Sequence, residues 1–190
     1  PFEKKKVEKR IIEECIEISQ WAPSAHNCQP WRYIIIDNKE QRLTLVDKMN
    51  EKLRKDLKND YKSEEEIEKK IELTRDQFLN SPLMILSCMD STVLYIYPDN
   101  ERNKNEFILG NLSVSSSITY LLISFQKYGL ASCWYSAPLF TREIVLSILN
   151  LPKTYYPIAF ITVGYPKKKE IKPPIRQPLN KILFFSSNLM

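Results

Sequence analysis

The residues best suited to binding chemistry lie together in one short segment, W-A-P-S-A-H-N-C-Q-P-W-R, from Trp21 to Arg32. Four polar side chains are concentrated there: Ser24, His26, Asn27 and Gln29. Two tryptophans and two prolines stiffen the segment, and a stiff polar loop between rigid elements is a common place for binding groups. Side-chain amides donate and accept hydrogen bonds together, which suits a flat heterocycle whose edge alternates carbonyl and N–H groups.

An ordinary loop is the competing interpretation of this segment. In that case the polar groups satisfy only their own backbone, and the residue types alone do not decide between the two. His26 taken by itself is more typical of a hydrogen-bonded loop histidine than of a catalytic base. No Ser/His/Asp triad is legible in the sequence.

The rare residue types exclude several kinds of site. The three glycines, Gly110, Gly129 and Gly164, are far apart, so neither a G-x-G-x-x-G turn nor a Walker phosphate loop can be written. His26 is the only histidine, which excludes H-E-x-x-H and other two-histidine metal sites. The four cysteines are too widely spaced for a zinc knuckle or a C-x-x-C pair. We therefore predict no metal site.

Length and composition favour one soluble domain over residues 1–190. The chain is 43% hydrophobic and 27% charged, which is ordinary for a globular protein. The net charge of +5 is a mild bias, so no nucleic-acid partner is predicted. Unclustered cysteines and the lack of a signal peptide favour the cytoplasm. No apolar run approaches the roughly 20 residues of a membrane helix, so no membrane partner is predicted.

Apolar periodicity predicts a mixed pattern of helices and strands. Helices are expected over residues 6–21, 39–59, 63–81, 103–128 and 141–150, and strands over residues 31–37, 83–89, 132–136 and 158–165. Without strict β-α-β alternation, this pattern predicts an α+β fold with helices packed on one sheet. The helix at 103–128 is apolar nearly all round, so we place it at the centre of the core.

Three residues are expected to mark helix ends. Ser63 and Glu66 match a capping box, Gly129 should follow the end of the long helix, and Thr141 should cap the last helix. In the helix at 39–59, the inward positions are expected to be Leu43, Val46 and Leu53. The basic, proline-rich tail from Lys167 should lie extended.

Four segments in order resemble the nitroreductase family. The loop is similar to that family's flavin loop, P-S-x-x-N-x-Q-P-W-R. Residues 129–134, G-L-A-S-C-W, resemble its G-L-G-S-C-W, and residues 151–166 resemble its L-x-L-P … P-x-A … x-G-Y-P. Residues 176–179, R-Q-P-L, resemble its R-x-P-L. Any one of these is weak evidence, but four in order span nearly the whole chain.

This resemblance implies a nitroreductase-like α+β fold with a central, mostly antiparallel sheet flanked by helices. It also implies an intertwined homodimer in which the tail, residues 167–190, wraps the partner. FMN would be held non-covalently at the dimer interface, with NAD(P)H as electron donor and a small molecule as acceptor. The chemistry would belong to the flavin, so no catalytic side chain is implied.

The resemblance also implies which residues bind FMN. The ribityl chain and ring would be bordered by Pro23, Ser24, Ala25, His26, Asn27 and Gln29. The ring would be covered by Trp134, Tyr135, Ser136 and Ala137. Arg176 would approach the phosphate, which a planar guanidinium can bind in bidentate fashion. A cation beside the flavin N(1) would stabilise the reduced ring; the candidates are Lys48, Lys52 and Arg54, for which a solvated helix face is the alternative.

Two features depart from the family pattern. The family usually opens with R-R-S-x-R-x-F, and Phe2 falls where that phenylalanine would lie. The arginines that bind the phosphate in the family are therefore not in the given sequence, and have been either cut away or lost. Ala131 stands where the family often has glycine. Each charge-assisted contact is worth roughly 1.5–3 kcal/mol, so loss of two would weaken FMN binding by about a hundredfold or more.

Several other functions stay open. Residues 81–83, 97–102 and 137–140 resemble the flavin reductase domain fused to the deazaflavin-coenzyme γ-glutamyl ligase and its free-standing relatives. A flavin-fragmenting dimethylbenzimidazole synthase and a flavin-binding protein without turnover are further alternatives. Arg32 could equally form a structural ion pair or contact a substrate. Cys28 and Cys133 are expected to be buried, inert thiols.

Overall fold

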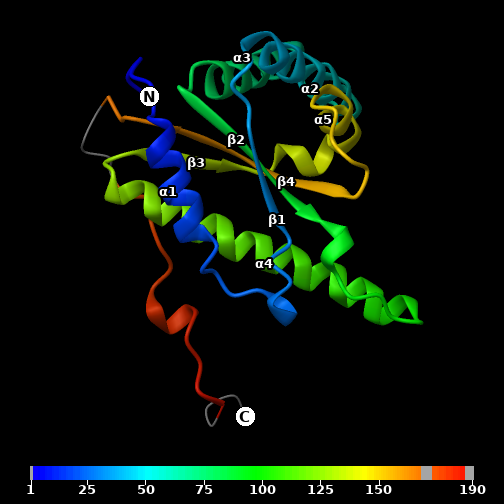
Figure 1. Cartoon of the computed structure of the whole chain (residues 1–190). Helices are drawn as coiled ribbons and strands as arrows, with labels where there is room; N and C mark the ends of the chain where they lie inside the picture. Colours follow the sequence, from blue (N-terminus) through cyan, green and yellow to red (C-terminus); the bar gives the residue numbers. More distant parts are fainter. Residues whose placement is uncertain (1, 168–172, 187–190) are drawn as a thin grey trace.

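A four-stranded sheet forms the centre of the molecule (Figure 1). The computed structural model describes residues 2–167 and 173–186. The strands are β1 (Trp31–Ile35), β2 (Leu83–Asp90), β3 (Ala131–Tyr135) and β4 (Tyr155–Gly164), in the order β1-β2-β4-β3. Every neighbouring pair is antiparallel. The α+β prediction is confirmed, and β1 and β3 form the two edges of the sheet.

Helices cover both faces of this sheet. One face carries α1 (Lys9–Ser19) and α4 (Asn100–Lys127), and the other carries α2 (Lys39–Asn59), α3 (Glu64–Leu79) and α5 (Arg142–Ile148), as Figure 1 shows. All eight residues of β2 are buried. Successive side chains of a strand point to opposite faces, so Ile85 joins the core with α4, whereas Met84 and Leu86 join the core with α2 and α3.

Serines on α4 attach α1 to the long helix. The Ser117 hydroxyl donates to the carbonyl of Ser19 at 2.9 Å, and the Ser124 hydroxyl donates to the carbonyl of Cys15 at 3.4 Å. Both serines are buried, and buried polar groups stabilise a fold only when they are paired in this way. The last turn of α1 is thereby fixed, and with it the start of the loop that follows.

The long helix α4 is only half in the core, contrary to our expectation. Val114, Ile118, Leu121 and Phe125 are buried, but a second apolar set on the helix is exposed: Phe107, Ile108, Leu109, Leu112, Tyr120 and Ile123. By length and composition α4 could also cross a membrane, a criterion that core helices of soluble proteins meet as well. Its apolar character all round therefore reflects one buried face and one uncovered face.

Two of the predicted helix ends are confirmed. The Ser63 hydroxyl accepts from the Glu66 N–H at 3.3 Å, while the Glu66 carboxylate accepts from the Ser63 N–H at 3.0 Å. These bonds from Ser63 lower the pKa of Glu66. Gly129 follows the last turn of α4 with φ +67°, a conformation that favours glycine.

Two predictions of detail were wrong. The hydroxyl of Thr141 does not cap α5; it donates instead to the carbonyl of Ala137 at 3.1 Å, because Thr141 follows directly on a 3-10 turn. On α2, Leu43 is 43% exposed, and Leu45, Val46 and Met49 fill the core. Of the three predicted inward positions, Val46 is buried as expected and Leu53 is half-buried, so only Leu43 was misplaced.

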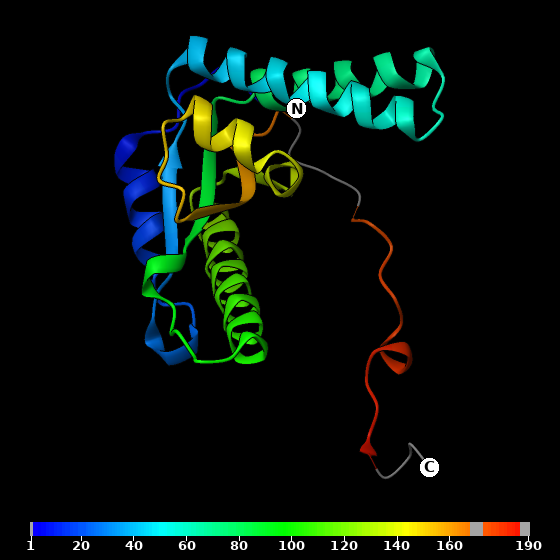
Figure 2. The same cartoon turned by 90° about the vertical axis from the view of Figure 1, so that its right-hand side faces the viewer.

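The tail projects away from the body of the protein in both views (Figures 1 and 2). Its described residues, 173–186, contain one short 3-10 helix, η4 (Leu179–Lys181), and no strand; the predicted wrapping of a partner chain stays a prediction. Six apolar side chains of the tail are exposed: Ile175, Leu179, Ile182, Leu183, Phe184 and Phe185. Three lysines of the basic tail, Lys168, Lys169 and Lys172, lie outside the described residues.

Candidate functional site

The loop between α1 and β1 has an unusually strained backbone. His26, Asn27 and Gln29 have φ values of 54°, 52° and 45°. Only five non-glycine residues in the described ranges have positive φ, so three of them fall within four positions of this loop. Left-handed backbone at such residues costs roughly 1–3 kcal/mol each and persists only where surrounding contacts enforce it. Strain of this kind is typical of binding sites.

Two serine hydroxyls enforce this backbone. The Ser24 hydroxyl accepts from the Gln29 N–H at 3.2 Å, which closes the loop on itself. The Ser113 hydroxyl, on α4, accepts from the Ala25 N–H at 3.1 Å and donates to the carbonyl of Leu109. The 3-10 turn η1 (Ala25–Asn27) is thus attached to the central helix rather than left free.

The two amides of the loop lie at the surface and next to each other. The Gln29 side-chain nitrogen donates to both the backbone and side-chain oxygens of Asn27, each at 3.3 Å. Both residues are exposed, as are Pro23 and His26, while Ser24 and Ala25 are half-buried. The structure therefore gathers the predicted loop residues into one cluster that presents side-chain amides outward.

Arg32 supports the loop from β1. One guanidinium nitrogen lies 2.9 Å from an Asp90 carboxylate oxygen, and the other donates to the carbonyl of Gln29 at 3.2 Å. Asp90 is 9% exposed at its side chain and also accepts from the Thr92 N–H. Of the two interpretations of Arg32, the structural ion pair is confirmed.

The second predicted segment lies on β3 and the 3-10 helix η3 (Ala137–Phe140). The Trp134 ring packs against the core shared with α1 and α4, and its N–H donates to the Ser136 hydroxyl at 2.9 Å. The Tyr135 ring packs on the other face, edge-on to Phe78 at 5.0 Å, and burial raises its pKa. Because these two rings face opposite sides of the sheet, only one of them can lie against a bound ring.

One chain does not bring the two segments together. The loop precedes β1 and the second segment contains β3, and these strands are the opposite edges of the sheet. Three strand spacings of about 4.8 Å separate the edges by roughly 14 Å. Arg176 lies apart from both segments, on the projecting tail (Figure 2). Within the described residues its guanidinium donates a hydrogen bond only to the carbonyl of Ile175, at 3.4 Å.

The three cations proposed for the flavin N(1) are engaged elsewhere. Lys48 lies 2.8 Å from Glu51, Lys52 lies 2.6 Å from Asp56, and Arg54 pairs with Glu64 and Glu68 of α3. They form the solvated, ion-paired face of α2, which was the alternative interpretation.

The cysteine prediction is wrong for Cys133, which is exposed. Cys28 is half-buried, and burial, followed by the charge of Glu106, raises the pKa of its thiol. Cys133 is exposed because β3 is an edge strand.

Three residues of interest had no clear sequence signal. Asn50 on α2 is 5% exposed, and neither atom of its amide has a hydrogen-bond partner within the described chain. Glu106 is a buried carboxylate on α4, and Ser113 anchors the loop. In the sequence, Asn50 is marked only by being a polar residue close to the inward positions Val46 and Met49.

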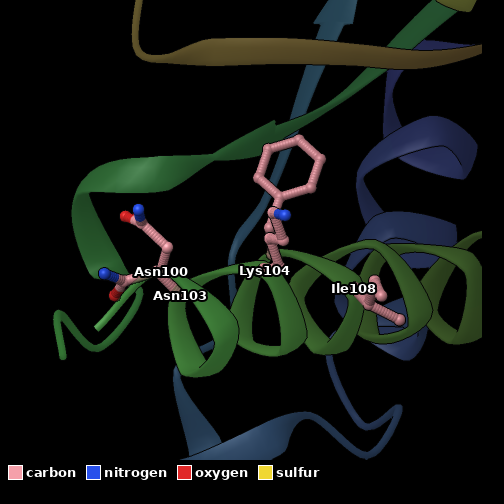
Figure 3. Close-up of a pocket in the computed structure, with 5 residues that line it drawn as sticks. Asn100, Asn103, Lys104 and Ile108 are labelled. Atoms are coloured by element: carbon pink, nitrogen blue, oxygen red, sulfur yellow. The ribbon is translucent and has the colours of Figure 1, made fainter.

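Two hollows adjoin these elements. One, of about 370 Å³, lies beside the loop and β1 and is lined by Ile16, Gln20, Gln29, Trp31, Arg32 and Tyr33. The other, of about 510 Å³, runs along the first turns of α4 (Figure 3) and is lined by Asn100, Asn103, Lys104, Phe107 and Ile108. The first hollow places Gln29 at the edge of a space large enough for part of a flat ligand.

The fold is α+β, with a polar loop anchored to its central helix. The sequence matches the Nitroreductase family over residues 1–165. This chain belongs to the nitroreductase family.

Similar proteins support this assignment. The chain is 25% identical over 177 residues to an iodotyrosine deiodinase of Nematostella vectensis, covering 91% of this chain and 65% of that protein, which is less than two thirds of its length. A BluB-like flavoprotein of Clostridium difficile 630 superimposes with a TM-score of 0.73 at 19% identity, over 97% of this chain and 92% of the other. An FMN-dependent nitroreductase of C. difficile R20291 gives 0.64 at 19% identity, over 97% and 91%. These structures share the fold.

Proposed function

We propose that this chain is an FMN-dependent oxidoreductase that passes electrons from a reduced nicotinamide to a small organic acceptor. The observation that carries the proposal is the strained loop from Pro23 to Gln29, which is attached to α4 and presents two side-chain amides. Strained backbone held by defined contacts favours a binding role over an ordinary loop. Membership of the nitroreductase family supplies the cofactor class.

The residues present fit FMN. The Asn27 and Gln29 amides offer donors and acceptors side by side, which matches the alternating carbonyl and N–H edge of the flavin ring. Asn50 has a buried amide without a partner in the described chain, and such groups are rarely left unpaired in native proteins. When bound, FMN supplies a ring that accepts hydride at N(5) and returns the electrons to a second substrate.

The chain's own side chains would bind and orient rather than react. Under this proposal, Asn27 and Gln29 hold the ring edge and Ser24 keeps their backbone in place. Arg176 neutralises the phosphate by a charge-assisted contact. The Trp134 ring, fixed by its bond to Ser136, excludes water from one side.

We further propose that the site is completed by a second copy of the chain. The two predicted segments lie at opposite sheet edges, which supports a site to which each chain contributes one of them. The uncovered apolar face of α4 and the apolar side chains of the tail are surfaces that a partner would bury. Exposed apolar patches of this extent are typical of protein interfaces.

An anaerobic spectrum tests the oxidoreductase proposal. Purified full-length chain is loaded with FMN, gel-filtered and mixed with NADH or NADPH. We expect flavin absorbance to bleach, then to return when a nitroaromatic or quinone acceptor is added. Bound FMN that never bleaches would instead indicate a flavin-binding protein without turnover.

A second candidate function is reductive deiodination, favoured by the iodotyrosine deiodinases among the relatives. In that reaction two electrons and one proton replace an aryl C–I bond by C–H and release iodide. The same reduced protein is therefore tested with 3-iodotyrosine, with iodide release as readout. Deazaflavin acceptors and the formation of dimethylbenzimidazole in oxygen test the two remaining alternatives.

A further inference from the structure

Glu106 is a buried carboxylate that the proposed FMN contacts do not use. It lies on α4 and is 2% exposed. One carboxylate oxygen lies 3.5 Å from the His26 side-chain nitrogen Nε2, and the other accepts from the Tyr95 N–H at 3.2 Å. Burying a carboxylate is unfavourable unless it is paired and hydrogen-bonded. Glu106 meets that requirement only through two segments that are far apart in sequence.

The two segments that Glu106 contacts also touch each other. The rings of His26 and Tyr95 stack with centroids 4.3 Å apart and planes 18° apart. His26 is one of the residues with left-handed backbone, at φ 54°. Glu106, His26 and Tyr95 therefore form a closed set of three contacts. Other ionisable groups adjoin this set. The Glu106 charge acts on the Cys28 thiol, the Tyr97 ring lies edge-on to that of Tyr95 at 6.5 Å, and the Arg102 guanidinium lies over the Tyr97 ring.

Glu106 and Ser113 hold the loop from the same helix, seven residues apart. A spacing of seven places both side chains on one face of α4, two turns apart. Ser113 binds the backbone where the 3-10 turn begins, and Glu106 binds the side chain one residue later. Ser113 holds the backbone of the loop at Ala25, and Glu106 holds the His26 ring, so the two residues position different parts of the loop.

We propose that Glu106 is a positioning residue that preforms the FMN loop before cofactor binds. By holding His26 against Tyr95, it keeps the neighbouring Asn27 and Gln29 amides in one arrangement. A loop ordered in advance binds more tightly, because less freedom is lost on binding. The link to FMN rests on the proposed function, whereas the ordering of the loop does not.

The single histidine allows a test without cofactor. In the NMR spectrum of the full chain, the ring protons of His26 should be shifted upfield by the stacked Tyr95 ring. Glu106→Gln keeps an acceptor for the Tyr95 N–H but loses the charge, so the shift should shrink. Glu106→Ala loses both contacts, so the protons should resonate near their random-coil positions. Glu101→Gln, which removes an exposed charge from the same helix, is the matched control and should leave them unchanged.

The second measurement is the dissociation constant for FMN. We expect Glu106→Ala to weaken binding by about tenfold, with Glu106→Gln intermediate, because the loop must then be ordered on binding. Tyr95→Leu should reproduce the Ala result. Tyr95 is 54% exposed, so this variant tests the stack without a buried substitution. Unchanged His26 resonances in Glu106→Ala would overturn the ordering role of Glu106, and unchanged FMN affinity in both Glu106→Ala and Tyr95→Leu would overturn its link to FMN. If the unaltered chain rejects FMN, the proposed function fails, and the NMR series still decides the role of Glu106.

Discussion

The two segments assigned to the flavin site differ in how they are supported. The loop at Pro23–Gln29 is held by buried groups of α4 and by Arg32, and its backbone is strained. The segment from Trp134 to Ala137 is an edge strand followed by a 3-10 turn, in which the Trp134 ring N–H donates to Ser136 and the carbonyl of Ala137 accepts from Thr141. The loop is thus held in place by contacts from several other elements of the same chain, whereas the second segment lies at an edge of the sheet. Under the proposed function, the loop would supply the specific contacts to FMN, and the edge would supply a surface that a second chain brings to it.

The largest expected effect concerns the partner chain. Leu179→Asp with Phe184→Asp places charges on two exposed tail residues. Burying such a side chain contributes about 1.5–3 kcal/mol, so the dimer dissociation constant should rise at least about a hundredfold. Analytical ultracentrifugation measures this. Tyr61→Asp, at a residue 97% exposed on the distant α2–α3 connection, is the control and should stay dimeric. A dimer that survives the tail variant would mean that the tail is not part of the interface.

The next effect concerns the loop amides. Asn27→Ala with Gln29→Ala removes two hydrogen-bonding groups worth about 0.5–1.5 kcal/mol each. The strained backbone at position 27 is also harder for alanine to adopt. FMN binding, measured by fluorescence quenching, should weaken by up to about a hundredfold.

The matched control for the loop variant is Asn150→Ala. Asn150 also has left-handed backbone, at φ 50°, but lies after α5. It should lose stability from strain and keep its FMN affinity. Equal loss of FMN binding in both variants would show that the loop amides have no specific role.

A smaller effect on FMN affinity should distinguish substitutions at two buried serines of α4. Ser113→Ala removes the acceptor for the Ala25 N–H, whereas Ser124→Ala removes a bond to Cys15 at the middle of α1. Each should lower the free energy of unfolding by about 1 kcal/mol. Only Ser113→Ala should also weaken FMN binding, by about fivefold. Equal FMN affinities in the two variants would contradict the anchoring role of Ser113.

The smallest effect compares the cysteines of the two segments. The raised pKa of Cys28 keeps its thiol neutral at pH 8, and only the thiolate reacts. Alkylation at Cys28 should therefore be slow at pH 8 and accelerate as the pH rises through its pKa, whereas the exposed Cys133 should react first. Peptide mapping after timed iodoacetamide treatment measures both. Faster modification at Cys28 than at Cys133 would mean that the loop is open rather than anchored.

Much of the fold could be predicted from local sequence. The helix at Lys39–Asn59 matches its predicted bounds, and the capping box at Ser63 was read directly from residue types. The loop was identified because its polar residues and prolines are adjacent in the chain. These features depend on neighbours in sequence, so periodicity and spacing reveal them.

The supports of the loop could not be predicted in the same way. Glu106 and Ser113 lie some 80 residues from the loop, on a helix whose pattern shows only that it is apolar. That pattern could not distinguish an apolar face in the core from one left for a partner, so α4 was placed too deep. The position of Trp134 at the far edge depends on strand order, which residue spacing does not encode.

We propose that each flavin site combines the loop of one chain with the β3 segment of another. Complementation tests it directly. One variant carries Asn27→Ala with Gln29→Ala, and the other carries Ser136→Glu at an exposed position. Each alone should bind FMN poorly. When the two are unfolded together and refolded, mixed dimers should hold one intact site, so tight binding should return at about one FMN per mixed dimer. If the mixture binds no better than its components, the two segments do not come from different chains and the account is wrong.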